Sequence, residues 1–212
     1  MAKKDSAPRI ETVSPGAAIP GGEIQIHGAG LATADAAPVV SIGDVAARLL
    51  VTSDSLLIAK VPEGAAVSEV SVSSNGATSP AYTCDIGIQI AEGIHPVSNP
   101  AVDDLGNVYT TFSGSRGQKT PVAVYKIDLN YNARHFVPDL MNATGLAFSP
   151  EGVLHVSSRF DGVVYQVNGA GDLTVYCEGM GTATGLAFDR SGNLYVGDRS
   201  GTIFKISPDR QI

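Results

Sequence analysis

The C-terminal half of the chain contains the segment Ala143-Thr-Gly-Leu-Ala-Phe-Ser-Pro-Glu-Gly-Val-Leu-His-Val156. It returns 40 residues later as Ala183-Thr-Gly-Leu-Ala-Phe-Asp-Arg-Ser-Gly-Asn-Leu-Tyr-Val196. A looser copy, Asn99–Tyr109, precedes both. Self-similarity at a fixed period is the signature of a repeat architecture, in which each copy is one supersecondary unit. The C-terminal half of the chain is therefore predicted to consist of three related units.

Further short apolar runs follow each copy. A third strand is expected at Tyr125–Ile127, Tyr165–Val167 and Phe204–Ile206, and a fourth at Ala133–Phe136 and Leu173–Tyr176. Four short strands in a period near 40 residues are typical of a β-propeller blade. We therefore expect a partial propeller of about three four-stranded blades over residues 97–212. A closed propeller needs at least four blades, so the chain is either a fragment or completes a ring with further copies of itself.

Residues 8–88 have a different pattern, with short runs of alternating apolar residues separated by glycine and proline. The runs are Ile24–Ile26, Val39–Ile42, Leu56–Val61 and Val67–Val72. A period of two indicates strands, and their spacing is typical of an all-β sandwich. The pair Asn75-Gly76 predicts a hairpin turn, because both central residues of a type I′ turn need positive φ.

Two segments of this first part, Pro8–Gly16 and Ile19–Leu31, resemble an IPT/TIG domain. Val40–Gly43 and Leu57–Pro62 fit later strands of the same family in the same order. The chain departs from the family at Leu31, where an aromatic residue is usual. The resemblance implies an immunoglobulin-like domain that serves as a spacer, a docking surface or a module that contacts carbohydrate or protein.

The third repeat, Gly185–Ile206, resembles the NHL repeat and the broader regucalcin/gluconolactonase-like propellers. In the lactonases a Glu, two Asn and an Asp hold a divalent cation near the channel. This chain has Thr144 and Thr184 where the family has the asparagine, and threonine is a poor ligand for a hard cation. No cofactor is therefore predicted, and calcium is expected only if further blades supply a lactonase centre.

Propeller topology places the loops before the inner strand and after the second strand on one face. The ligand-binding candidates on that face are Asn99, Arg116, Asn142, Thr144, Arg159, Thr184, Asp198 and Arg199. An arginine follows the second strand in all three repeats, and converging guanidinium groups would suit a carboxylate, a phosphate or an acidic sugar. The alternative is that each arginine pairs with a carboxylate of its own blade, such as Asp161 or Asp198. We predict no catalytic residue and no metal ligand.

Charge and composition narrow the choice of partners. The chain has 14 basic and 21 acidic residues, a net charge of −7, and neither half has the positive excess that nucleic-acid binding requires. No run of about 18 apolar residues predicts a membrane span, and no secretory signal is visible, which favours a cytoplasmic chain as it stands. Cys84 and Cys177 lack metal or redox spacing and are expected to be buried thiols.

The function that we favour from the sequence is a non-catalytic binding or scaffolding module for a protein or carbohydrate ligand. One alternative is a metal-dependent sugar-lactone hydrolase whose metal site lies in blades absent from this chain. A further alternative is a half-propeller that self-associates through its open blade edges, because unpaired strand edges are templates for pairing.

Overall fold

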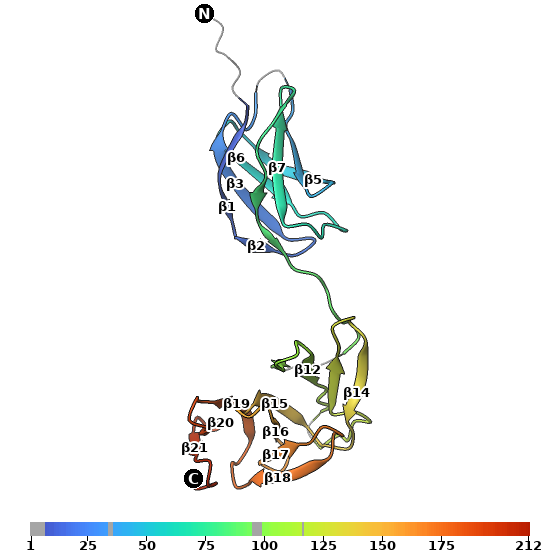
Figure 1. Cartoon of the computed structure of the whole chain (residues 1–212), viewed down its shortest axis with the longest axis vertical. Helices are drawn as coiled ribbons and strands as arrows, with labels where there is room; N and C mark the ends of the chain where they lie inside the picture. The colour runs from blue at the N-terminus through green and yellow to red at the C-terminus, as the bar shows by residue number, and fades with distance from the viewer. Residues whose placement is uncertain (1–6, 34–35, 95–98, 116) are drawn as a thin grey trace, which may run out of the picture. The chain divides into compact units, whose positions relative to one another are not determined.

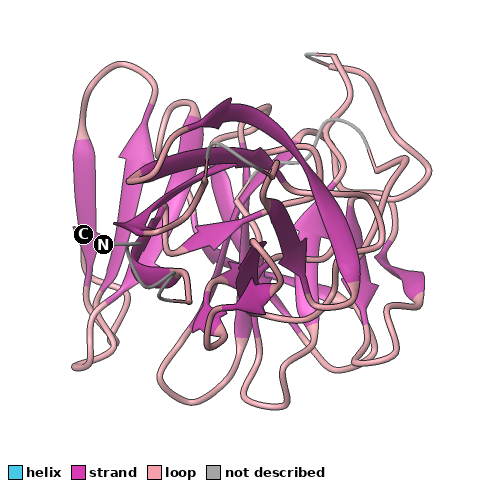
Figure 2. Ribbon diagram, turned by 90° about the horizontal axis from the view of Figure 1, so that it is seen from above, coloured by secondary structure: helices cyan, strands magenta, loops and turns pink. Residues whose placement is uncertain are grey.

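The computed structural model describes residues 7–33, 36–94, 99–115 and 117–212. Figure 2 shows strands joined by loops, and the described residues contain no helix. None of them therefore forms a helix long and apolar enough to cross a membrane. The chain divides into two compact units, Met1–Gln89 and Ile90–Ile212. The all-β prediction is confirmed.

The first unit is an immunoglobulin-like β-sandwich. Its strands are β1 (Arg9–Ser14), β2 (Ala17–Ala18), β3 (Glu23–Ala29), β4 (Val39–Ile42), β5 (Val45–Thr52), β6 (Leu56–Lys60), β7 (Glu69–Ser74), β8 (Ala77–Thr78), β9 (Tyr82–Thr83) and β10 (Asp85–Ile86). They follow the order β1-β3-β6-β5-β4-β7-β8, with β9 also on β7 and a separate parallel pair β2–β10. Strand β5 pairs first with β4 and then with β6, and so joins the two layers.

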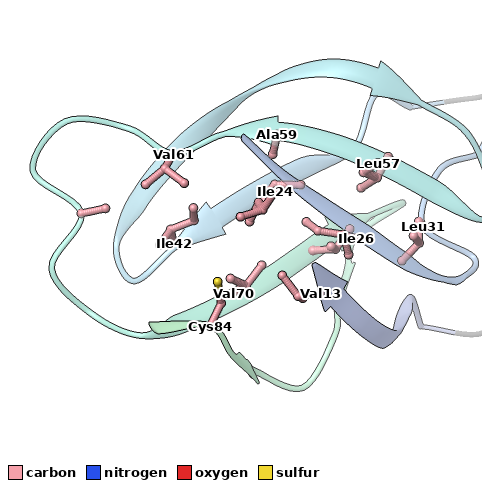
Figure 3. Close-up of a cluster of buried hydrophobic side chains, with 13 residues drawn as sticks. Val13, Ile24, Ile26, Leu31, Ile42, Leu57, Ala59, Val61, Val70 and Cys84 are labelled. Carbon is pink, nitrogen blue, oxygen red and sulfur yellow. The ribbon is translucent and has the colours of Figure 1, made fainter. Parts of the chain in front are cut away.

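The alternation of apolar residues along these strands fills the core of the sandwich. Ile24 and Ile26 on β3 and Val70 on β7 are completely buried (Figure 3). Val72 on β7 is completely buried as well. Burying each such side chain contributes roughly 1.5–3 kcal/mol. Leu31 is also fully buried, so it takes the place of the aromatic residue that is usual in the family.

The predicted hairpin turn after β7 is confirmed. Asn75 and Gly76 have φ values of 48° and 79°, and the flanking residues Ser74 and Ala77 pair with each other. Strand β5, in contrast, was not among the strands expected from the sequence.

The second unit consists of three consecutive antiparallel sheets. The first contains β11 (Ala101–Val102), β12 (Val108–Thr111), β13 (Val124–Ile127) and β14 (Ala133–Val137); the second contains β15 (Ala143–Phe148), β16 (Leu154–Ser158), β17 (Val163–Val167) and β18 (Leu173–Cys177); the third contains β19 (Ala183–Phe188), β20 (Leu194–Asp198) and β21 (Ile203–Ile206). Figure 1 shows them in chain order, from β12 and β14 through β15–β18 to β21. They are blades of a partial propeller, and the third has three strands rather than four in the part described.

Neighbouring blades pack through shared apolar clusters. The Tyr109 ring of β12 lies edge-on to the Phe148 ring of β15, with centroids 5.3 Å apart. One repeat later, the ring centroids of His155 on β16 and Phe188 on β19 are 4.8 Å apart. His155 is therefore a buried strand residue, as its place in the repeat predicted.

Candidate functional site

The inner strands of the second and third blades share a β-bulge at the end where the candidate residues gather. Ala143 pairs with Ser158 and Leu146 pairs with Val156, so that two residues, Thr144 and Gly145, lie opposite one. The third blade repeats this register at its own Thr-Gly pair. A bulge bends a strand and re-aims its side chains, and here it directs the Thr144 hydroxyl to the Asn142 carbonyl, 3.0 Å away.

Asn142 is completely buried and holds a loop of the preceding blade. Its Nδ2 donates to the carbonyl oxygens of Gly114 and Ser115 at 3.0 and 2.9 Å, and its Oδ1 accepts the Gly117 N–H at 2.8 Å. Its φ of 51° lies in the left-handed region that asparagine tolerates. Asn142 therefore positions this loop, and its side chain is fully occupied within the protein.

Arg159 follows β16 and reaches the same loop. Its Nη2 donates to the Gly114 carbonyl at 2.9 Å, so Arg159 and Asn142 share one acceptor. The Arg159 Nε is buried and has no hydrogen-bond partner among the described residues. No carboxylate of the described chain forms an ion pair with this guanidinium group.

Phe160, the next residue, was not a candidate from the sequence. Its side chain is 49% exposed, and its ring lies near Gly117, where a Cβ atom would be 3.5 Å from Phe160 Cε2. The corresponding turn of the third blade has Ser200 at this position. Aligning the two turns residue by residue would have revealed this aromatic side chain on the exposed turn.

The nearby carboxylates are engaged by donors other than arginine. Asp161 accepts the Tyr165 hydroxyl at 2.9 Å, and burial together with this carboxylate raises the pKa of Tyr165 to about 12. Asp198 accepts hydrogen bonds from Ser200 and from the Thr182 N–H, and these donors lower the pKa of Asp198. In the described structure, neither Asp161 nor Asp198 forms an ion pair with the arginine of its own blade, which was the alternative considered from the sequence.

Two of the remaining candidates, Thr184 and Arg199, lie at the corresponding end of the third blade. Thr184 donates to the Gly197 carbonyl at 2.8 Å, and Arg199 is exposed with its backbone N–H on the Thr182 carbonyl. Asn99 is exposed before β11, and Arg116 lies outside the described residues. The structure thus connects Asn142 with Arg159 through one loop.

The part of the chain that is described contains no metal-binding cluster and no activated thiol. No group of three or more His, Cys, Asp or Glu side chains there could hold a metal ion. Cys84 and Cys177 are free and buried, as expected, and burial raises the pKa of Cys177 to about 11. A thiol with a raised pKa is a poor nucleophile at neutral pH.

Comparison with known protein families settles the nature of the first unit. Residues 8–85 match the family model of the IPT/TIG domain. The first unit is a TIG domain. The chain as a whole matches no curated protein.

Solved structures with a similar arrangement of strands include two auxiliary nutrient binding proteins and a streptogramin B lyase. The protein from Bacteroides thetaiotaomicron is 11% identical with a TM-score of 0.44, over 95% of this chain and 70% of that one. The protein from Bacteroides ovatus is 15% identical with a TM-score of 0.43, over 96% and 57%. The streptogramin B lyase is 13% identical with a TM-score of 0.46, over 100% and 69%. The chain thus spans 57 to 70% of the length of these proteins, and likenesses this distant assign it neither a ligand nor a reaction.

Proposed function

We propose that the chain is a non-catalytic binding module and that Arg159 and Phe160 form its ligand site. The ligand is an acidic carbohydrate, whose carboxylate binds the Arg159 guanidinium and whose sugar ring lies on the Phe160 side chain. The observation that carries the proposal is that one short turn holds a half-exposed aromatic ring and an arginine that has no carboxylate partner among the described residues. The TIG domain acts as a spacer or docking module.

The Arg159 guanidinium group is preorganised to bind a carboxylate. One guanidinium nitrogen is fixed on the Gly114 carbonyl, which orients the planar group before a ligand arrives. Less side-chain freedom is then lost on binding.

The aromatic ring supplies the apolar part of the site. Phe160 offers a flat apolar surface on the same turn as Arg159, and small-molecule sites are lined largely by apolar and aromatic side chains with a few polar groups that fix the ligand's orientation. The turn that holds them is firm, since the Gly162 N–H donates to the Ser158 carbonyl and the Gly162 carbonyl accepts the Met180 N–H, both at 3.1 Å. A rigid support of this kind is what a preorganised site needs.

Titration calorimetry with trigalacturonic acid, in buffer with EDTA, tests the proposal. We expect saturable binding by the native chain and none of the uncharged trigalactose. Arg159→Gln should weaken binding about 10- to 100-fold, because a charge-assisted hydrogen bond contributes roughly 1.5–3 kcal/mol. Phe160→Ala should weaken it several-fold, and its exposed position makes the fold tolerant of the change.

Arg190→Gln is the matched control, because it removes the same charge from an exposed turn at the opposite end of the third blade. We expect it to bind like the native chain. Equal losses for Arg159→Gln and Arg190→Gln would contradict the site. Binding that appears only when EDTA is left out and calcium is added, or turnover of a sugar lactone, would instead favour a metal-dependent hydrolase.

A further inference from the structure

The second blade differs from its neighbours at the end opposite Arg159, where two of its turns lie. The first turn runs from Ser149 to Val153 and the second from Asn168 to Asp172. In each turn the N–H of the first residue donates to the carbonyl of the fifth, and the N–H of the fourth donates to the carbonyl of the first. The turns of the other two blades repeat these bonds, so residues at corresponding positions can be compared directly.

In the first and third blades, a side chain of the second turn covers the glycine of the first turn. A Cβ atom on Gly106 would lie 3.0 Å from Leu129 Cδ2. In the third blade, a Cβ atom on Gly192 would lie 3.4 Å from Pro208 Cγ. The corresponding residue of the second blade is Gly169, which has no side chain to cover the turn beside it.

A charged pair is also replaced at this end of the second blade. In the first blade the Lys126 ammonium lies 3.7 Å from the Asp103 carboxylate, and Lys205 occupies the same register position in the third blade. The second blade has Gln166 at this position and Ser149 in place of the aspartate. Two uncharged side chains therefore stand where the first blade has an ion pair.

An open pocket of about 410 Å³ lies between these two turns. Among the residues that line it are Gly152, Val153, Gln166, Asn168, Gly169 and Thr174, and none of its lining side chains is charged. Its volume is within the range of small-molecule sites, roughly 300–1,000 Å³. The second blade thus has an uncharged pocket where the first blade has a covering leucine and an ion pair.

Two side chains of the pocket offer hydrogen bonds to a ligand. Gln166 and Thr174 lie directly opposite each other on β17 and β18, so their side chains project from the same face of the sheet. Neither side chain forms a hydrogen bond within the described part of the chain. Val153 adds an apolar wall. At the edge of the pocket, Asp104 Oδ2 would lie 4.0 Å from a Cβ atom on Gly152, and this carboxylate disfavours an anionic ligand.

We propose that this pocket binds a neutral acetamido sugar, an N-acetylhexosamine, through its acetamido group. The Gln166 amide donates to the acetamido carbonyl, the Thr174 hydroxyl accepts from its N–H, and its methyl group packs on Val153. A sugar with hydroxyl groups alone lacks the methyl group and the amide, so it is not expected to bind. The site is separate from the one at Arg159 and does not depend on it.

A titration of the ¹⁵N-labelled chain with tri-N-acetylchitotriose, followed by amide chemical shifts, tests the site. We expect saturable shifts centred on Gly152, Val153, Gln166 and Gly169. Cellotriose, which has a hydroxyl in place of each acetamido group, should produce none of them. An absence of shifts with tri-N-acetylchitotriose, shifts of equal size with cellotriose, or shifts centred on Arg159 would overturn the proposal.

Two variants separate the pocket from the rest of the blade. Gly169→Leu restores the covering side chain of the first blade, and the fold can accept it because Gly169 has no positive φ and a Cβ atom there would meet nothing within 4 Å. This variant should lose the shifts, because the leucine fills the pocket, while its spectrum outside residues 149–174 stays that of the native chain. Gln166→Leu should weaken binding about 2- to 10-fold, the contribution of one uncharged hydrogen bond.

Gln25→Leu is the matched control for Gln166→Leu, because it makes the same change at an exposed position of β3 in the TIG domain. It should bind tri-N-acetylchitotriose like the native chain. Unchanged binding by Gly169→Leu, or equal losses for Gln166→Leu and Gln25→Leu, would overturn the proposal.

Discussion

Gly145 of the second blade lies so close to Thr184 of the third that a Cβ atom on the glycine would stand 2.1 Å from the Thr184 carbonyl oxygen. The neighbour is backbone of a paired strand and cannot move aside cheaply. We therefore expect Gly145→Ala to destabilise the blades by about 1–3 kcal/mol, in the range of overpacked cores. Urea unfolding followed by tyrosine fluorescence measures the free energy of unfolding of the blades, because six of the seven tyrosines lie in residues 90–212.

The chain contains its own control for this substitution. Gly185 occupies the same bulge position in the third blade, has no positive φ, and would meet nothing within 4 Å if it carried a Cβ atom. Gly185→Ala should leave stability unchanged or raise it slightly. Equal effects of the two substitutions would show that the glycine serves the bulge alone and not the approach of the next blade.

Ser157 connects the same two blades by hydrogen bonds. Its Oγ donates to the Thr184 carbonyl at 2.6 Å and accepts the Gly145 N–H at 2.8 Å, and the side chain is fully buried. Ser157→Ala leaves both backbone groups without this partner, so we expect a loss of about 1–3 kcal/mol in urea unfolding. Ser191→Ala, in an exposed turn, should change stability by less than about 0.5 kcal/mol. The interpretation fails if the two variants are equally stable.

His155 makes the blade interface sensitive to acid. Burial lowers the pKa of His155 below its usual value, with Arg210 as a further cause, while Glu151 and the Val153 carbonyl act in the opposite direction. Protons therefore bind more readily to the unfolded chain, and stability that is present above about pH 6.5 is lost as the pH falls toward the lower folded-state pKa.

The variant His155→Tyr separates this effect from the titration of carboxylates, because tyrosine occupies the equivalent position in the other two blades. We expect the native chain to lose more unfolding free energy than His155→Tyr between pH 7.5 and pH 5.5. Parallel pH profiles of the two proteins would show that His155 is protonated equally in both states.

The core of the TIG domain should respond independently of the blades. Ile24 is completely buried in a cluster whose members all belong to the first unit. Ile24→Ala should destabilise that unit by about 2–5 kcal/mol, through lost burial and the cavity left behind. Hydrogen exchange followed by mass spectrometry should show faster exchange in strands β1 to β10 and unchanged exchange in residues 101–206. Faster exchange in both units would indicate a single cooperative structure.

Much of the fold could be predicted because its signals are local. The repeated Ala-Thr-Gly-Leu-Ala-Phe segments became the inner strands β15 and β19, and Asn75-Gly76 became the tight turn. Strand β5 was missed because its sequence, Val-Ala-Ala-Arg-Leu-Leu-Val-Thr, lacks strict alternation. It changes partner from β4 to β6 along its length, so no single face stays buried.

The candidate site was harder to predict because it depends on contacts between repeats. Sequence spacing placed Asn142 and Arg159 at one end of the blades, but it could not show that both bind the Gly114 carbonyl. Arg159 was expected through its recurrence in the repeat. Phe160 was missed because it does not recur: the third blade has Ser200 at this position. A comparison that looks only for residues shared by the repeats passes over such a difference.

A titration of the ¹⁵N-labelled chain with trigalacturonic acid, followed by amide chemical shifts, tests the proposed site most directly. We expect saturable shifts concentrated at Arg159, Phe160 and the adjoining Gly114 and Gly117, with the TIG domain unaffected. Trigalactose should produce none of them. An absence of shifts at Arg159 and Phe160 at the highest sugar concentration, or shifts centred on another part of the chain, would contradict the proposed site.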